Sequence, residues 1–300
     1  MTSRLITPYR DALLTRALPD GAFAVAQGEG SRPDATAWAA IALYATGGAD
    51  KEIAAARAAL TRAQLTDGSV PVIAQCPRAA WPTSLAILAW LPDPSYRSHV
   101  EAAGAWLLSH PGKHWPKDAR AVFAHDPSIK GWPWIDDTHS WVEPTAQAML
   151  ALIAMGLAEA PQIAEAGRML LDRQLPDGGW NYGNTKVFRN TLLPFPEATG
   201  LALAALGAMP KRPDRAKVAA SIAYLSQPQC AVPTPLTAVW RAFGLTAWDA
   251  APPDALDLVA TCLEKQTRYG PYDTPLLAQA VAALASDGRF EALLHGGAHG

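Results

Sequence analysis

The sequence predicts an all-α protein in which six helical hairpins close into an (α/α)6 toroid. Three observations lead to this prediction: a repeated turn motif, an apolar helix after each turn, and helices that lack a polar face. Hydrophobic residues make up 50% of the 300 residues and charged residues only 17%. A chain of this length and composition can bury a large core without disulfide bonds or a structural metal.

A turn motif recurs along the chain. Residues 174–180 read Gln-x-x-x-Gly-x-Trp, and residues 64–70 and 266–272 keep the Gln and the Gly before a different final residue. Residues 17–23 keep the spacing without the glutamine. Each copy follows an Ala- and Leu-rich stretch, and the Asp-Gly pair in three of the four copies favours a tight turn. The motif therefore marks the end of a first helix in each unit.

A second, apolar helix is predicted after each turn, because proline beside an acidic or hydroxyl residue is typical of a helix start. Such starts lie at residues 34–36, 81–83, 143–145, 195–199, 234–237 and 273–275. The glycines Gly47, Gly156, Gly207 and Gly244 favour helix ends nearby. Six starts give six hairpins over roughly residues 7–290, so residues 1–300 are expected to form a single domain.

The second helices are expected to form a closed inner ring. Segments 41–44, 85–88 and 149–153 have almost no polar face, which is typical of helices that are buried on several sides. An open solenoid would need polar repeats at its ends. The last apolar segment, residues 275–284, has no polar face either, and this favours closure.

Charge and cysteine content exclude several classes of protein. The 25 basic and 27 acidic residues give a net charge of −2, which does not favour nucleic-acid binding. No stretch approaches the ~18 apolar residues of a membrane span, and the polar start Met1–Leu5 does not predict a secretory signal. Cys76, Cys230 and Cys262 form no CxxC pair. We therefore expect a cytoplasmic protein without a metal or another cofactor.

The turn motifs, the six hairpins and the order of loop and inner helix resemble the squalene/hopene cyclase and protein prenyltransferase superfamily. Residues 131–146 also resemble a stretch of uncharacterised bacterial members. The resemblance covers nearly the whole chain. It implies a small-molecule isoprenoid or lipid substrate, and it leaves open a peripheral contact with the inner membrane face and the oligomeric state.

The acidic motifs of that superfamily are present only in part. Class II terpene cyclases protonate their substrate with an Asp in a D-x-D-D-T-A run, and aligning Thr145-Ala146 places Glu143 on the middle acid. Trp141 and Pro144 take the other two aspartate positions. The prenyltransferases bind zinc through an Asp-x-Cys pair, whereas Asp137-x-His139 here lacks the thiolate. The resemblance therefore implies an acid, and no metal is expected.

The loop from Gly131 to Glu143 is the predicted site. A carboxyl group among tryptophans loses solvation and can donate a proton, and aromatic faces stabilise a carbocation. The catalytic candidates are Asp136, Asp137, Glu143 and His139, and the substrate-binding candidates are Trp81, Trp132, Trp134, Trp141, Tyr182, Phe195 and Tyr272. The structural alternatives are a turn at residues 136–138 and an interaction of Glu143 with the helix start.

Other polar residues have simpler interpretations. Asp34, Glu197 and Asp273 lie at inner-helix starts, where capping accounts for them. The remaining histidines have no metal-ligand spacing and are expected on the surface or in loops: His99, His110, His114, His125 and His295.

The sequence favours one function and leaves two alternatives open. The first hypothesis is a terpene or meroterpene cyclase-like enzyme, an isomerase that protonates and cyclises a linear isoprenoid without metal. The first alternative is a non-catalytic toroid that binds a prenyl chain or lipid. The second is a carbohydrate-active (α/α)6 enzyme that pairs Asp136 or Asp137 with Glu197.

Overall fold

The computed structural model describes residues 2–118, 120–227 and 234–295, so Cys230 and the tail 296–300 lie outside the described residues. The outer helices are α1 (Thr2–Leu14), α3 (Asp50–Ala63), α5 (Arg97–Ser109), α7 (Pro161–Asp172), α9 (Arg215–Leu225) and α11 (Ala255–Glu264). The inner helices are α2 (Pro33–Thr46), α4 (Pro82–Trp90), α6 (Val142–Ala154), α8 (Pro196–Ala208), α10 (Pro235–Thr246) and α13 (Thr274–Ala285). Shorter elements are η1 (Pro94–Tyr96), β1 (Lys186–Val187), β2 (Asn190–Thr191), α12 (Gln266–Tyr269) and η3 (Phe290–Leu294).

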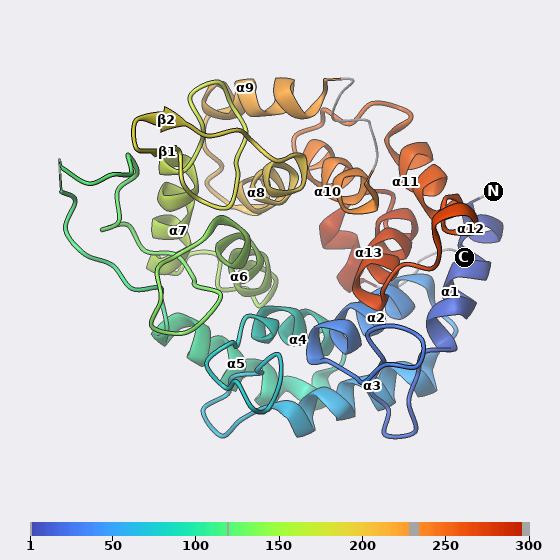
Figure 1. The fold of residues 1–300 in the computed structure, drawn as a ribbon. Coiled ribbons are helices and arrows are strands. Elements are labelled where there is room, and N and C mark those ends of the chain that lie inside the picture. The colour runs from blue at the N-terminus through green and yellow to red at the C-terminus, as the bar shows by residue number, and fades with distance from the viewer. Residues whose placement is uncertain (1, 119, 228–233, 296–300) are drawn as a thin grey trace.

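The six hairpins close into a ring, as predicted. Figure 1 looks along its axis and shows the inner helices surrounded by the outer ones. Each inner helix contacts the next in the order α2, α4, α6, α8, α10 and α13, and α13 contacts α2. Because all inner helices start at the same end, the long outer-to-inner connections gather on one face, which we call the loop face. None of the helices in the described parts of the chain is long and apolar enough to cross a membrane.

A threonine in the first turn of four inner helices anchors the loop before it. Its hydroxyl accepts a hydrogen bond from the backbone N–H of the residue that ends the turn. The donor–acceptor pairs are Phe23–Thr36 (3.0 Å), Val70–Thr83 (2.8 Å), Trp132–Thr145 (2.9 Å) and Trp180–Thr199 (2.9 Å). The third hairpin lacks the sequence motif, yet Trp132 makes the same bond as Trp180, so the hairpin is a regular member of the repeat.

Helices α8 and α10 pack closely enough for their backbones to meet at two glycines. A Cβ atom on Gly200 would overlap the carbonyl oxygen of Trp240, and one on Gly244 would lie 2.5 Å from the carbonyl oxygen of Gly200. The helix ends predicted near Gly207 and Gly244 are confirmed, since α8 ends at Ala208 and α10 at Thr246, but both glycines lie inside the last turns of these helices. Gly244 is needed for the close approach of two backbones rather than for termination.

The first and last hairpins are joined by buried polar contacts. The Arg16 guanidinium donates to the carbonyl oxygen of Tyr272 (2.7 Å) and to the Thr274 hydroxyl (3.1 Å). Thr274 donates in turn to the carbonyl oxygen of Ala24 (2.5 Å), and its backbone N–H bonds to Val25 (2.7 Å). These contacts form the seam of the ring.

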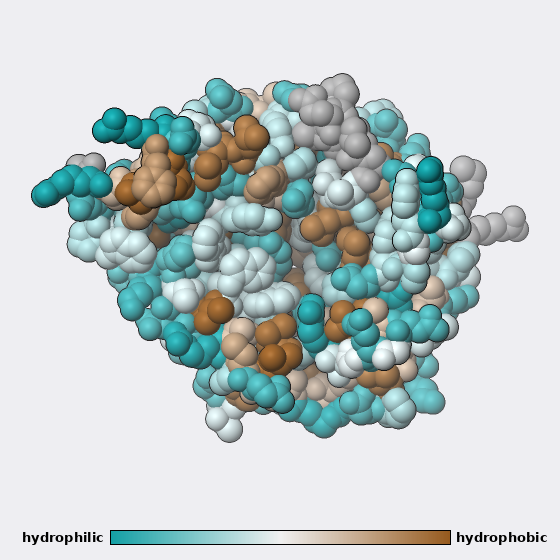
Figure 2. All heavy atoms as spheres, in the orientation of Figure 1, coloured by the Kyte–Doolittle hydropathy of each residue, from teal (hydrophilic) through white to brown (hydrophobic). Residues whose placement is uncertain are grey.

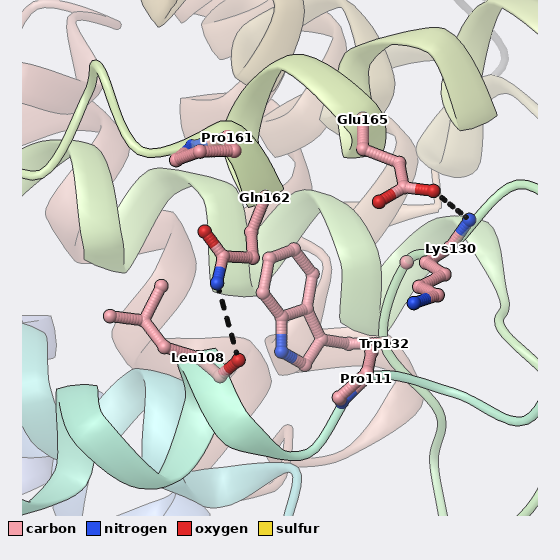
Figure 3. A pocket seen from close by; sticks show the side chains of 8 residues that line it. Leu108, Pro111, Lys130, Trp132, Pro161, Gln162 and Glu165 are labelled. Atoms are coloured by element: carbon pink, nitrogen blue, oxygen red, sulfur yellow. Dashed lines mark hydrogen bonds between the residues drawn. The ribbon is translucent and has the colours of Figure 1, made fainter.

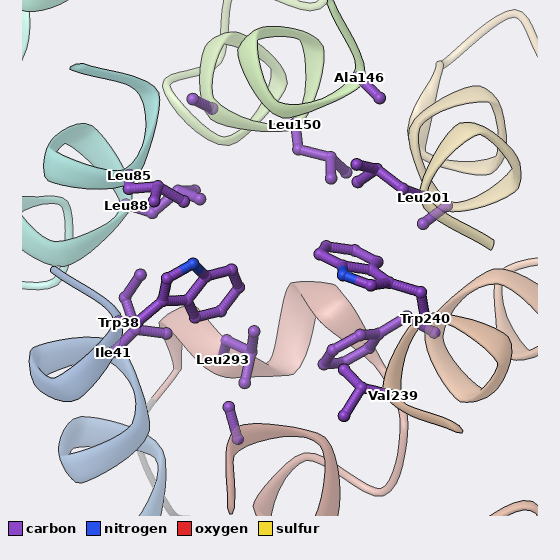
Figure 4. Packing of buried hydrophobic residues seen from close by; sticks show 14 of the residues in the cluster. Trp38, Ile41, Leu85, Leu88, Ala146, Leu150, Leu201, Val239, Trp240 and Leu293 are labelled. Atoms are coloured by element: carbon purple, nitrogen blue, oxygen red, sulfur yellow. The ribbon is translucent and has the colours of Figure 1, made fainter. Parts of the chain in front are cut away.

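The centre of the ring is filled with apolar side chains. Figure 4 shows Trp38 and Trp240 pointing toward the axis from opposite sides, with Leu85, Leu150 and Leu201 around them. The two indoles meet edge to face, with ring centroids 6.4 Å apart. Segment η3 lies against this cluster through Leu293, which is 2% exposed.

A small β-hairpin interrupts the connection between α7 and α8. Lys186 pairs with Thr191 and Val187 with Asn190, so the turn consists of Phe188 and Arg189. Both turn residues have a left-handed φ, 48° and 68°, which costs about 1–2 kcal/mol for each residue that is not glycine. A bond from the Phe188 N–H to the Val122 carbonyl oxygen (2.9 Å) attaches the turn to the loop before α6.

Candidate functional site

The side chain of Glu143 stands in the first turn of α6, at the loop face of the ring. The Gln147 amide, one turn further along, donates to its Oε1 atom over 3.4 Å. Burial of the carboxyl, and after it the negative charge of Glu197, together raise the pKa of Glu143 from 4.5 to about 7. A large share of Glu143 carboxyls is therefore protonated at neutral pH.

Glu197 occupies the same position on the neighbouring inner helix α8. Its Oε2 atom accepts a hydrogen bond from the Thr237 hydroxyl of α10 (3.3 Å), and Thr237 accepts one from the Thr234 hydroxyl (2.9 Å). The two carboxyls therefore have different partners, an amide on the same helix for Glu143 and a threonine hydroxyl from the next inner helix for Glu197.

The other acidic residues at helix starts have structural partners. The Asp273 carboxylate accepts from the Leu276 N–H (2.9 Å), which makes it the expected cap of α13. Asp34 is buried, and its two carboxylate oxygens accept from Nε (2.9 Å) and Nη2 (2.6 Å) of the Arg32 guanidinium. Only Asp273 among them makes the helix cap that the sequence led us to expect.

Asp136 and Asp137 lie in the loop, on the outer side of the predicted site. Asp137 is 66% exposed and pairs with Lys113 (3.4 Å) and Arg78 (3.7 Å). The Asp136 carboxylate accepts from the Asp137 N–H (2.9 Å), and Asp137 has a left-handed φ of 62°. The backbone N–H of Asp136 bonds to the Arg78 carbonyl oxygen (2.7 Å), so these acids fasten one loop to another.

The aromatic candidates occur as separate pairs around the loop face. Trp81 meets Trp134 edge to face at 5.3 Å, and together with Asp136 they line one small pocket. Tyr182 meets Phe195 at 5.1 Å. Tyr272 is placed across the ring at the start of α13, and its hydroxyl donates to the Cys262 carbonyl oxygen (2.5 Å).

Trp132 and His139 are two further residues of the predicted site. Trp132 is buried, and its indole N–H donates to the Leu107 carbonyl oxygen (2.8 Å). Figure 3 shows it beside Gln162 and Glu165 of α7, in a cavity of about 230 Å³ away from the ring axis. The His139 ring contacts Trp141, with centroids 4.2 Å apart. Burial, and then the charge of Arg173, lower the pKa of His139, which favours a neutral ring.

Sequence reasoning missed three polar side chains of this site, Gln147, Thr234 and Thr237, as partners of the two glutamates. The position of Gln147 four residues after Glu143 was a usable signal, because residues at this spacing share one helix face. The contact of Thr237 with Glu197 spans two hairpins, and no local pattern announces it.

His125 was expected on the surface or in a loop. It does lie in a loop, but it is only 6% exposed and its Nδ1 atom has no hydrogen-bond partner. Burial, with the nearby charge of Arg173, lowers the pKa of His125 from 6.5 to about 3. Among the described residues, no group of three or more His, Cys, Asp or Glu side chains is arranged to hold a metal ion.

The buried ring of His125 predicts a loss of stability in acid. Between pH 6.5 and about pH 3, His125 is protonated in the unfolded chain but neutral in the folded chain. The free energy of unfolding therefore falls by roughly 1.4 kcal/mol for each pH unit of acidification in this window. His125→Gln should remove this dependence, as measured by urea unfolding from pH 7 down to pH 4. The exposed His114→Gln is the matched control. Equal slopes for wild type and His125→Gln would contradict the prediction.

Comparisons with known proteins identify the fold. No protein-family model matches the chain, and no curated protein matches it. The type II terpene cyclase MstE from Scytonema superposes with a TM-score of 0.63 at 15% identity, over 95% of this chain and 98% of that one. The chain has the α/α toroid fold of this structure. A glycosidase has the same fold, with a TM-score of 0.58 at 13% identity over 96% of both chains.

Structures with bound small molecules are also similar to this chain. A variant of MstE in complex with geranylgeranyl dihydroxybenzoate, its substrate, superposes with a TM-score of 0.61 at 14% identity, over 98% of this chain and 97% of that one. A glycosidase variant in complex with glucose superposes with a TM-score of 0.57 at 13% identity, over 96% of both chains. At these identities the comparisons establish the toroid fold of the chain and not its reaction.

Proposed function

We propose that the protein is an enzyme that protonates and cyclises a linear isoprenoid, with Glu143 as the proton donor. The observation that carries the proposal is the raised pKa of Glu143, about 7, at the start of an inner helix. The same residue is the carboxyl that aligns with the middle acid of the cyclase motif. A general acid is most effective when its pKa lies near the working pH.

The apolar interior supports a hydrocarbon substrate. Leucine and tryptophan side chains of the inner helices gather around the ring axis (Figure 4). Since Trp38 and Trp240 meet across the ring, we place the substrate chain between this pair and the loop face. Their aromatic faces and those of Trp81 and Trp141 would stabilise a carbocation near them.

The proposed reaction is an isomerisation. Glu143 transfers its proton to a terminal carbon–carbon double bond, and the resulting cation is attacked by the next double bond, so that a ring closes. Loss of a proton from the final cation forms a new double bond and restores the proton balance. The Gln147 amide and the Thr237–Glu197 contact lie beside the donor and define its surroundings.

The reaction can be tested with geranylgeranyl dihydroxybenzoate as a probe, in heavy water. Protonation by an exchangeable acid should give a cyclic isomer of the probe that carries one deuterium, detected by mass spectrometry. Bound but unchanged probe would favour the alternative of a prenyl-binding protein. Probe that neither binds nor reacts would count against every isoprenoid function.

The rate of this reaction should depend on pH through Glu143. The donor must be protonated, so the initial rate should be level below about pH 7 and fall tenfold per unit above it. Initial rates measured between pH 5.5 and 9 give the profile. A rate that stays constant or rises between pH 7 and 9 would exclude Glu143 as the acid.

A glycosidase is the second candidate. Glu143 and Glu197 are a carboxyl pair in which one member favours the protonated form, as glycoside hydrolysis requires, and a glycosidase shares the fold. The sequence indicated Asp136 or Asp137 as the partner of Glu197, and we propose Glu143 in their place. Release of nitrophenol from nitrophenyl glycosides by the wild type, and not by Glu143→Gln, would favour this function over cyclisation.

A further inference from the structure

The exposed apolar side chains of the protein lie on one face. Every large hydrophobic side chain that is exposed in the described parts of the chain belongs to a connection from an outer to an inner helix. Two of these side chains precede helix α8: Phe188 is 72% exposed and Leu193 is 77% exposed. Val122, on the neighbouring loop, is 51% exposed. Exposed apolar groups of this size gathered together indicate a surface that meets another apolar phase.

The hairpin that carries Phe188 holds an unfavourable conformation at its tip. A two-residue turn with both φ angles positive normally consists of Asn-Gly or a similar pair. Here the pair is Phe188-Arg189, with φ values of 48° and 68°. The neighbouring loop holds the turn through the Phe188–Val122 backbone bond (2.9 Å) and a bridge between Phe123 and Val187. The fold therefore maintains an aromatic and a basic side chain at the tip against backbone preference.

Basic residues surround this apolar tip. Residues 117–126 and 184–193 contain four basic residues, Lys117, Arg120, Lys186 and Arg189, all exposed, and two acidic ones, Asp118 and Asp126. The carboxylate of Asp126 is occupied by the Ser128 N–H (2.9 Å) and hydroxyl (2.6 Å). The local excess is therefore two positive charges, four minus two, on a chain whose net charge is −2.

The tip projects from the ring. Figure 1 shows the β1–β2 hairpin and the neighbouring loop extending outward beside α7, and Figure 2 shows hydrophobic side chains over the hairpin with hydrophilic ones at its rim. A protein partner would need a broad complementary surface of about 800 Å² on each side. A projecting apolar tip with a basic rim instead suits the interface of a bilayer, where apolar groups enter the headgroup region and cations meet anionic lipids.

We propose that the β1–β2 hairpin and the loop at Val122 dock the protein on a membrane that contains anionic lipid, with Phe188 and Leu193 inserted among the headgroups. Lys186 and Arg189 contact the lipid phosphates. This surface lies on the loop face of the ring. The inference does not depend on the reaction at Glu143.

The test is sedimentation of the full-length protein with vesicles of phosphatidylcholine, with and without phosphatidylglycerol. The informative variant is Phe188→Asn together with Arg189→Gly, which gives the turn its favoured residues and removes the apolar and basic tip. We expect wild type to bind the anionic vesicles, less at high salt, and the double variant to bind at least about tenfold more weakly with an unchanged or higher melting temperature. The control is Tyr269→Ser, which removes a 69% exposed ring from another connection and should bind as wild type does.

Three results would overturn the inference. The first is equal binding of wild type and the double variant, and the second is no binding of wild type to either vesicle. The third is a wild-type dimer in sedimentation equilibrium that the double variant loses, without vesicle binding, which would make the tip a contact between two copies of the chain.

Discussion

Replacement of Glu143 by glutamine is expected to lower turnover of the isoprenoid probe by a factor of about 10³. Loss of a general acid typically costs 10²- to 10⁴-fold in rate, and the amide has no proton to give. The shape of the side chain is retained, so the probe should still bind. Measurement of kcat and KM separately distinguishes the two effects, and turnover above a tenth of wild type would rule out Glu143 as the donor.

The same variant should be more stable than wild type in alkaline solution. The folded carboxyl has a pKa raised from 4.5 to about 7, so its contribution to stability is lost as the pH rises through this range. At about 1.4 kcal/mol per pKa unit, the penalty approaches ~3 kcal/mol above pH 7. Urea unfolding at pH 8 and pH 4 should show the gain only at pH 8. The exposed Glu101→Gln, which lies on outer helix α5, should change neither turnover nor stability.

Replacement of Gly200 by alanine is expected to destabilise the protein by about 3 kcal/mol or more. The new methyl group would overlap the Trp240 carbonyl, and backbone atoms cannot rotate away as a flexible side chain can. Helix α8 would have to move from α10, which would also displace Glu197 from Thr237. Thermal unfolding followed by circular dichroism measures the loss.

The control for this variant is Gly30→Ala. A Cβ atom on Gly30 meets nothing within 4 Å, and the residue lies in a loop. Surface substitutions of this kind usually change stability by less than about 0.5 kcal/mol. A melting temperature of Gly200→Ala equal to that of Gly30→Ala would show that α8 and α10 are not packed as closely as described.

The ring was predictable because the evidence for it is repeated along the chain. The turn motif, the proline before each apolar run and the absence of polar faces all follow from local rules. Gly244 shows where such rules stop. A glycine near a helix end normally indicates termination, whereas this one is required by Gly200 on the preceding inner helix, 44 residues earlier in the sequence numbering.

The site was less predictable, because it depends on solvation. Asp136, Asp137 and Glu143 are equal as carboxylic acids in the sequence, and their separation comes from burial and from partners on other hairpins. Arg78 and Lys113 pair with Asp137. The charge of Glu197, on helix α8, raises the pKa of Glu143 on the neighbouring helix α6. His125 is a similar case, since nothing next to it in the chain reveals that Arg173 lies nearby.

The seam between the first and last hairpins changes how the repeats share their stability. In an open array each unit contacts only its neighbours, and terminal units unfold first. The bonds of Arg16 and Thr274 join positions 258 residues apart, so the array has no terminal unit from which fraying can begin. Folding of the ring is expected to be slowed by this seam, because a contact between residues so far apart in the sequence forms late. The ring should therefore unfold as one cooperative body, and should become a set of separately melting units once the seam is cut.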